Sequence, residues 1–170
     1  MSGLAAFGHL DPAGRAPAVR GARVLVLGYG NPGRQDDGLG PAAAAEIEKL
    51  DWPGVTVCDN YQLVIEDAID IAEHDVVWFV DAARTGAEPY EVRALSPAFD
   101  IAFTSHLVKP EALLAIAGQY YGKSPEAYLL GIRGYDFEFR EGLTDRASSN
   151  LAQAVALIRH RIGAFLEAAP

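Results

Sequence analysis

The sequence predicts an α/β fold, a three-layer α/β/α sandwich in which helices cover both faces of a mostly parallel, twisted sheet. Short apolar runs alternate along the chain with segments that carry apolar residues at helical spacing. The runs are almost continuously apolar, which is typical of parallel strands buried on both faces. With 170 residues, the chain is long enough for one compact domain. We expect this domain to span residues 21–168, after a flexible Ala-, Gly- and Pro-rich extension at residues 1–20.

The first half of the domain predicts three strands and two helices. Pro41 is suited to the first turn of a helix, and the run VVWFV is the most strand-like in the sequence. The expected strands cover residues 22–27, 55–58 and 76–80, and the expected helices cover residues 41–50 and 63–73.

The second half predicts an alternating edge strand, a helix, a buried strand and a long final helix. These elements are expected at residues 90–95, 110–121, 128–132 and about 145–166. Gly122 is placed to end the first helix and Thr144 to cap the start of the last one. The final helix should pack against the sheet through one apolar face, formed by Leu151, Val155, Ile158, Ile162 and Phe165.

Composition excludes several classes of function. The net charge of −9 argues against binding to nucleic acid or to anionic membranes, which depends on clustered Lys and Arg. No apolar run approaches the roughly 18 to 20 residues of a membrane helix. Cys58 is the single cysteine, so no intramolecular disulfide can form. Residues 1–20 lack the pattern of a signal peptide, and a cytoplasmic location is expected.

The stretch VLGYGNPGRQDDG at residues 26–38 contains the pattern G-x-G-x-x-G directly after a predicted strand. This pattern alone is a weak indication of a dinucleotide site, and Asp59 lies about where such a site places its ribose-binding acid. Asp36 and Asp37 oppose this interpretation. A phosphate charge about 4 Å from either carboxylate would cost roughly 4 kcal/mol at an effective dielectric near 20. One of these acids could instead complement a helix dipole.

Three candidate ligands follow predicted strands or precede a predicted helix: Asp37, Asp81 and His106. In parallel sheets, loops beyond the carboxyl ends of strands gather the binding groups. Two carboxylates and an imidazole suit a divalent metal such as zinc or nickel, with positions left for water or substrate. Each residue also has a plain structural interpretation, because Asp81 could cap a turn and His106 could be an ordinary loop histidine.

Nucleophilic catalysis has little support in the sequence. The G-x-S-x-G elbow of serine hydrolases is absent. Cys58 lies in a predicted strand without a recognisable signature, so a buried structural thiol is expected there.

These motifs, in this order and spacing, resemble the hydrogenase maturation protease family. GYGNPGRQDDGLG follows the first strand, Val-Asp-Ala follows a central strand, Ser-His precedes a Leu-rich helix, and Glu-Gly-Leu-Thr precedes the final helix. The resemblance covers about residues 24–162. It implies an aspartyl-type endopeptidase that removes the C-terminal extension of a NiFe-hydrogenase large-subunit precursor after nickel insertion.

The resemblance also implies the site. Asp37, Asp81 and His106 match the family's metal-binding residues, with Asp37 chosen because it holds the second position of the acidic pair. The nickel is carried by the substrate, although another divalent metal could replace it in vitro. Residues 60–67 lie where family members differ most, which predicts a role in substrate specificity.

Two other functions are compatible with parts of the sequence. A maturation chaperone could bind the same precursor without cutting it. Gly-Asn-Pro-Gly also resembles the first motif of bacterial peptidyl-tRNA hydrolases, but their Arg-His-Asn element is missing and the acidic chain is poorly suited to tRNA.

Overall fold

The computed structural model describes residues 21–99 and 108–168, which form one five-stranded sheet with the order β2-β1-β3-β5-β4. The first four strands in this order run parallel, and β4 pairs antiparallel with β5 at the edge. The strand bounds are Val24–Tyr29 (β1), Val55–Asn60 (β2), Val76–Ala83 (β3), Tyr90–Ala94 (β4) and Glu126–Arg133 (β5). The parallel strands all end at one side of the sheet, which we call the carboxyl edge.

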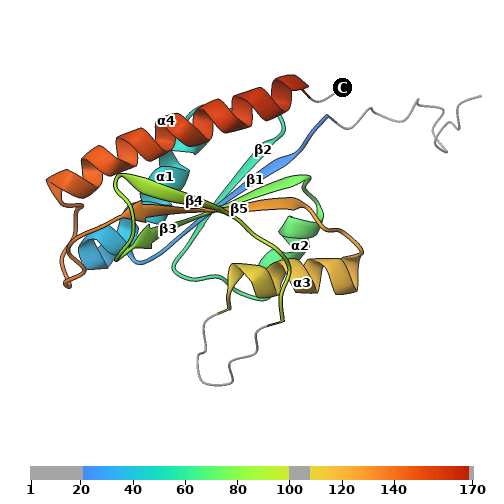
Figure 1. The fold of residues 1–170 in the computed structure, drawn as a ribbon, viewed down its shortest axis with the longest axis horizontal. Helices are drawn as coiled ribbons and strands as arrows, with labels where there is room; N and C mark the ends of the chain where they lie inside the picture. The colour runs from blue at the N-terminus through green and yellow to red at the C-terminus, as the bar shows by residue number, and fades with distance from the viewer. Residues whose placement is uncertain (1–20, 100–107, 169–170) are drawn as a thin grey trace, which may run out of the picture.

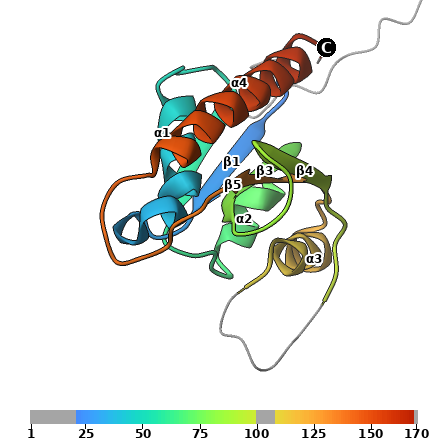
Figure 2. The same ribbon diagram turned by 60° about the vertical axis from the view of Figure 1, so that its left-hand side comes forward.

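Helices cover both faces of the sheet. Helices α1 (Leu39–Glu48) and α4 (Asp145–Ala168) lie on one face, and α2 (Asp67–Ala72) and α3 (Pro110–Tyr121) lie on the other (Figure 1). The turned view shows the same three layers, with β4 at the border of the sheet (Figure 2). The predicted α/β/α sandwich is therefore confirmed.

Each face of the sheet has its own apolar core. Alternate β1 residues face opposite sides: Val24 and Val26 pack towards α1 and α4, while Leu25 and Leu27 pack towards α2 and α3. The final helix buries Ile158 and Ile162 in the first core, as its apolar period predicts. None of the helices described in residues 21–99 and 108–168 is long and apolar enough to cross a membrane.

Every element predicted within the described ranges is present, and the largest differences in extent concern α2 and β3. Helix α2 begins at Asp67 instead of residue 63, because the Asp67 carboxylate accepts a hydrogen bond from the backbone N–H of Val64 at 2.8 Å and organises a turn before the helix. Strand β3 continues to Ala83, since Asp81 pairs with Gly131 of β5. Asp81 thus lies inside the strand, not after it. The expectation for residues 1–20 concerns a segment outside the described ranges.

Thr144 caps α4 and Gly122 ends α3, as expected. The hydroxyl of Thr144 accepts the backbone N–H of Ala147 at 3.3 Å. Gly122 has a φ of 67°, the left-handed conformation that favours glycine after a helix.

Two glycines bring α1 against the carboxyl ends of β1 and β3. A Cβ atom on Gly28 would overlap the carbonyl oxygen of Gly40 and lie 2.8 Å from Cβ of Ala44. A Cβ atom on Gly40 would in turn overlap the carbonyl oxygens of Tyr29 and Val80. Only glycine allows this approach, so the backbone contact fixes where α1 starts relative to the sheet.

The substitution Gly28→Ala should lower the free energy of unfolding by about 3 kcal/mol, because α1 must move away from the sheet. Urea denaturation measures this change. Gly163→Ala is the matched control: its added Cβ meets only the Trp52 ring, at 3.8 Å, and alanine favours the helix by about 0.5–1 kcal/mol. Equal stability of the wild type and Gly28→Ala would contradict the proposed close contact.

Candidate active site

The loop that follows β1 turns back on itself and brings Asp37 to the carboxyl edge. It contains a 3-10 segment, η1 (Pro32–Gly38), capped by Asn31, whose side-chain oxygen accepts the N–H of Gly33 at 2.9 Å. Gly30 has a φ of 139°, and a Cβ atom there would overlap the carbonyl oxygen of Asp37. The Asp37 carboxylate accepts the N–H of Asn31 at 3.0 Å. The glycines therefore hold Asp37 against the end of β1.

Asp81 lies near the carboxyl edge in β3, in a half-buried position. Burial raises the pKa of its carboxyl group to about 6, and the charge of Asp37 adds to this increase. Two groups act to lower this pKa: the N–H of Ala82, which donates to the carboxylate at 2.7 Å, and the phenol of Tyr29. Asp37 and Asp81 are thus close enough to repel each other, and a cation between them would relieve that repulsion.

Asp36 has a different role from its neighbour, because its side chain is 0% exposed. Its carboxylate accepts the N–H groups of Tyr135, Asp136 and Thr144 at 2.8, 3.1 and 2.8 Å, and the Thr144 hydroxyl at 2.9 Å. Although burial acts to raise the pKa of Asp36, these four hydrogen bonds hold it below its ordinary value. Asp36 joins the glycine loop to the β5–α4 loop, whereas Asp37 stays half-buried near Asp81.

Gln35, the residue before Asp36, stores backbone strain. Its φ of 46° and ψ of −115° are unusual for a residue other than glycine and cost of order 1–3 kcal/mol. Oriented with its nitrogen towards Asp136, the buried Gln35 amide donates to both carboxylate oxygens of Asp136, at 2.9 and 3.0 Å. This contact makes a second connection between the same two loops.

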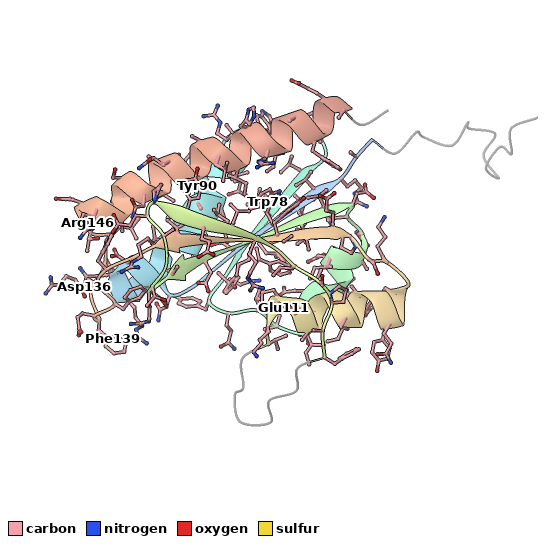
Figure 3. All side chains as sticks on the ribbon, viewed as in Figure 1. Trp78, Tyr90, Glu111, Asp136, Phe139 and Arg146 are labelled. Carbon is pink, nitrogen blue, oxygen red and sulfur yellow. The ribbon has the colours of Figure 1, made fainter. Side chains whose placement is uncertain are left out.

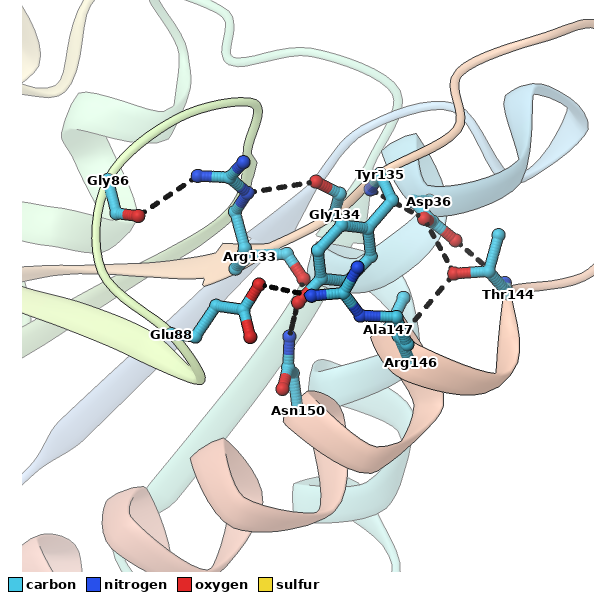
Figure 4. A network of polar contacts seen from close by, with 10 residues as sticks. All are labelled: Asp36, Gly86, Glu88, Arg133, Gly134, Tyr135, Thr144, Arg146, Ala147 and Asn150. Carbon is cyan, nitrogen blue, oxygen red and sulfur yellow. Dashed lines mark hydrogen bonds and ion pairs between the residues drawn. The ribbon is translucent and has the colours of Figure 1, made fainter.

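A polar network continues from Asp36 to the start of α4 (Figure 4). The Tyr135 hydroxyl accepts the side-chain amide of Asn150 at 2.8 Å, and the Arg146 guanidinium stacks 3.9 Å from the centre of the Tyr135 ring. Arg146 also pairs with Glu88 at 2.7 Å, which connects the β3–β4 loop. The loops that border the site are therefore held to one another by hydrogen bonds, an ion pair and a cation–π contact.

Arginine side chains stack on aromatic rings of the β5–α4 loop. Arg84 lies 3.8 Å from the centre of the Phe137 ring, and Arg34 lies 4.9 Å from that of Phe139. Phe139 is 84% exposed and lies on the same loop as Asp136, at the end of the molecule opposite the C-terminal end of α4 (Figure 3). The border of the site thus carries exposed aromatic surface.

The third predicted ligand, His106, lies outside the described residues, so the structure brings together two of the three candidates. Within residues 21–99 and 108–168, no group of three His, Cys, Asp or Glu side chains is arranged to hold a metal. Both ring nitrogens of the buried His74 already have partners, the Asp70 carbonyl oxygen at 2.6 Å and the Thr56 hydroxyl at 2.8 Å. His74 is therefore not available as a ligand.

The two alternative chemistries considered from the sequence are not supported by the local geometry. Helix α1 begins at Leu39, after the 3-10 segment Pro32–Gly38, so no glycine of the G-x-G-x-x-G pattern opens the helix as a dinucleotide site requires. Cys58 is half-buried in β2. Burial and then the charges of Asp70 and Asp67 raise the pKa of its thiol, which disfavours the nucleophilic thiolate.

Neither a contribution of Tyr29 nor the structural role of Asp36 was predicted from the sequence. Tyr29 is the variable position between two glycines of the motif, and strand alternation places it on the same face as Leu27. No comparable signal marks Asp36, because its partners are 99 to 108 residues away in the chain.

The fold matches solved structures of hydrogenase maturation proteases. The protease HycI from Thermococcus kodakarensis superposes with a TM-score of 0.66 at 21% identity, covering 88% of this chain and 95% of that one. The endopeptidase HybD from E. coli gives 0.63 at 20% identity, covering 80% and 89%. At these identities the similarity establishes the fold.

A further solved structure shares a somewhat higher sequence identity. The hydrogenase 2 maturation peptidase from a Thaumarchaeota archaeon has a TM-score of 0.63 at 27% identity, covering 83% of this chain and 98% of that one. The sequence matches no protein-family model and no curated protein.

The substitution Asp36→Asn should destabilise the fold by about 2–3 kcal/mol at neutral pH, because an amide cannot accept four hydrogen bonds from buried donors as a carboxylate does. The depressed pKa of Asp36 sets the pH dependence. Its stabilisation is complete above the ordinary value of 3.8 and is lost as the pH falls through the lower pKa of the folded state. The difference in unfolding free energy between wild type and variant should therefore shrink below about pH 4.

Asp37→Asn is the matched control for this stability measurement, because within the described part of the chain the Asp37 side chain accepts one backbone hydrogen bond, from Asn31. Its free energy of unfolding should stay close to that of the wild type. If the two variants lost equal stability, the structural role of Asp36 would be wrong.

Proposed function

This chain belongs to the hydrogenase maturation protease family, and we propose that it is the endopeptidase that removes the C-terminal extension from a nickel-loaded NiFe-hydrogenase large-subunit precursor. The observation that carries the proposal is the pair of carboxylates at the carboxyl edge. Asp37 and Asp81 are close enough to interact electrostatically, and the half-buried Asp81 accepts the N–H of Ala82 at 2.7 Å. Such a pair suits a divalent cation presented by a substrate.

In this proposal nickel is part of the substrate and serves as its recognition element. Asp37, Asp81 and His106 contact the nickel in a loaded precursor, which places the peptide bond beside the site. Proximity and orientation then supply much of the rate, and an unloaded precursor is not held in this way. The protease needs no resident metal for this selection.

The β2–α2 loop supports a role in the choice of substrate. It leaves the carboxyl edge directly after β2 and carries large exposed apolar side chains, with Tyr61 72% and Ile65 60% exposed. Exposed apolar groups beside a site are typical of surfaces that bind another protein. We assign this loop to recognition of the precursor, in agreement with its position in a variable part of the family.

Asp37→Asn and Asp81→Asn should each abolish release of the extension, because the substitution removes a negative charge that contacts the nickel. His106→Ala should do the same. The measurement is mass spectrometry of a nickel-loaded precursor, and of the same precursor without nickel, after incubation with each protein. The wild type should shorten only the loaded precursor.

Asp59→Asn is the control for these substitutions, because Asp59 is exposed near the carboxyl edge on β2 and outside the proposed ligand set. It should process normally. Normal processing by Asp37→Asn would contradict the assignment. Binding of the precursor without any shortening would favour the non-cleaving chaperone, and hydrolysis of peptidyl-tRNA would favour the other alternative.

A further inference from the structure

Two arginines from different loops contact one phenylalanine at the border of the site. The guanidinium of Arg84 lies 3.8 Å from the centre of the Phe137 ring, and Nη2 of Arg34 donates to the carbonyl oxygen of Phe137 at 3.4 Å. Arg34 also stacks on Phe139, 4.9 Å from the ring centre. We call these four residues the arginine–phenylalanine cluster. It lies at the end of the molecule where Figure 3 labels Phe139.

The cluster lies close in the chain to the two carboxylates proposed to contact nickel. Arg34 precedes Asp37 by three residues in the glycine loop, and Arg84 follows Asp81 by three residues at the end of β3. Three residues of chain span at most about 10 Å, so the backbone of each arginine lies within that distance of one acid. A peptide held at the two acids therefore needs only a few residues of its own to reach the cluster.

Neither arginine of the cluster forms an ion pair with a carboxylate within residues 21–99 and 108–168. By contrast, Arg146 on the same border pairs with Glu88 at 2.7 Å. The exposed acids of the β5–α4 loop, Glu138 and Glu141, leave both cluster arginines unpaired. In the described part of the chain, Nε of Arg34 is buried without a hydrogen-bond partner. The guanidinium groups thus keep donors available for a ligand.

Stacking on a ring holds a guanidinium in place without using its hydrogen-bond donors. The contact involves the flat face of the group, whereas the N–H bonds point outwards in its plane. A guanidinium held in this way matches the two oxygens of a carboxylate. Arg84 is exposed, and Phe139 is 84% exposed. The cluster therefore presents positive charge together with apolar surface to a partner.

We propose that the arginine–phenylalanine cluster binds a carboxylate of the precursor's C-terminal extension, while Phe139 packs against an apolar side chain of the same segment. This inference rests on the proposed function and deepens it, because the two acids contact a cation and the cluster holds an anion on the part that is released. The net charge of −9 repels an acidic peptide elsewhere on the surface. Two cations at this border therefore fix where such a peptide lies.

The test is Arg84→Met, which removes the charge and keeps an unbranched side chain beside the Phe137 ring. With nickel-loaded precursor, KM should rise about 5- to 10-fold, the effect of losing one partly solvated charged hydrogen bond. The kcat should stay within about twofold, because the contact is present equally in the bound substrate and in the transition state. Arg84→Lys should restore part of the binding, since the charge remains.

Arg159→Met is the matched control, because it makes the same change of charge at an exposed position on α4. Its KM should equal that of the wild type. The melting temperatures of both variants should stay close to the wild-type value, since neither side chain is buried. An equal rise of KM in Arg84→Met and Arg159→Met would show that only the overall charge matters, and would overturn the inference.

Two altered precursors identify the source of the carboxylate. In one, the Asp and Glu residues of the extension are replaced by Asn and Gln, and the other ends in a C-terminal amide. One of them should raise the wild-type KM as Arg84→Met does, and should raise the KM of Arg84→Met no further. If neither raises the wild-type KM, or if the effects add, the extension carries no carboxylate that binds Arg84 and the inference is wrong.

The outcomes separate this inference from the proposed function. If the wild type leaves the nickel-loaded precursor uncut, the proposed function fails. If the wild type cuts it and Arg84→Met has an unchanged KM, the cluster does not bind the extension, although the proposed function stands.

Discussion

The buried carboxylate of Asp36 is the interaction on which the rest of the site depends. It is enclosed by hydrogen-bond donors from Tyr135, Asp136 and Thr144, and a buried charge is tolerated only with such partners. The glycine loop and the β5–α4 loop are therefore held as one unit. Since Asp37 is covalently next to Asp36, fixing one residue in the core also fixes the backbone of the other, which lies half-buried after β1.

The glycine contacts make this arrangement possible. Gly28 and Gly40 let the start of α1 touch β1 and β3, and Gly30 lets the loop fold back on Asp37. The glycines that resemble a phosphate-binding turn thus have a different structural role. They bring a carboxylate to the carboxyl edge, beside Asp81, and the resulting concentration of negative charge suits a cation and disfavours a phosphate.

The architecture and the proximity of Asp37 and Asp81 could be predicted because both depend on local patterns. Apolar runs predict buried parallel strands, and the carboxyl-end rule predicts that Asp37 and Asp81 meet. The start of α2 could not be placed, because the Asp67 side chain competes for the preceding backbone. The position of His106 relative to the two acids stays a prediction.

The sequence by itself determined the fold class, the order of the elements and the set of acids from which the site is built, because strand alternation, helix periods and glycine spacing are short-range properties. Only the tertiary structure decided which acid does what. Asp36 and Asp37 are chemically identical neighbours. Asp36 is the one that is buried and connects two loops, because its hydrogen-bond donors come from a loop about a hundred residues away.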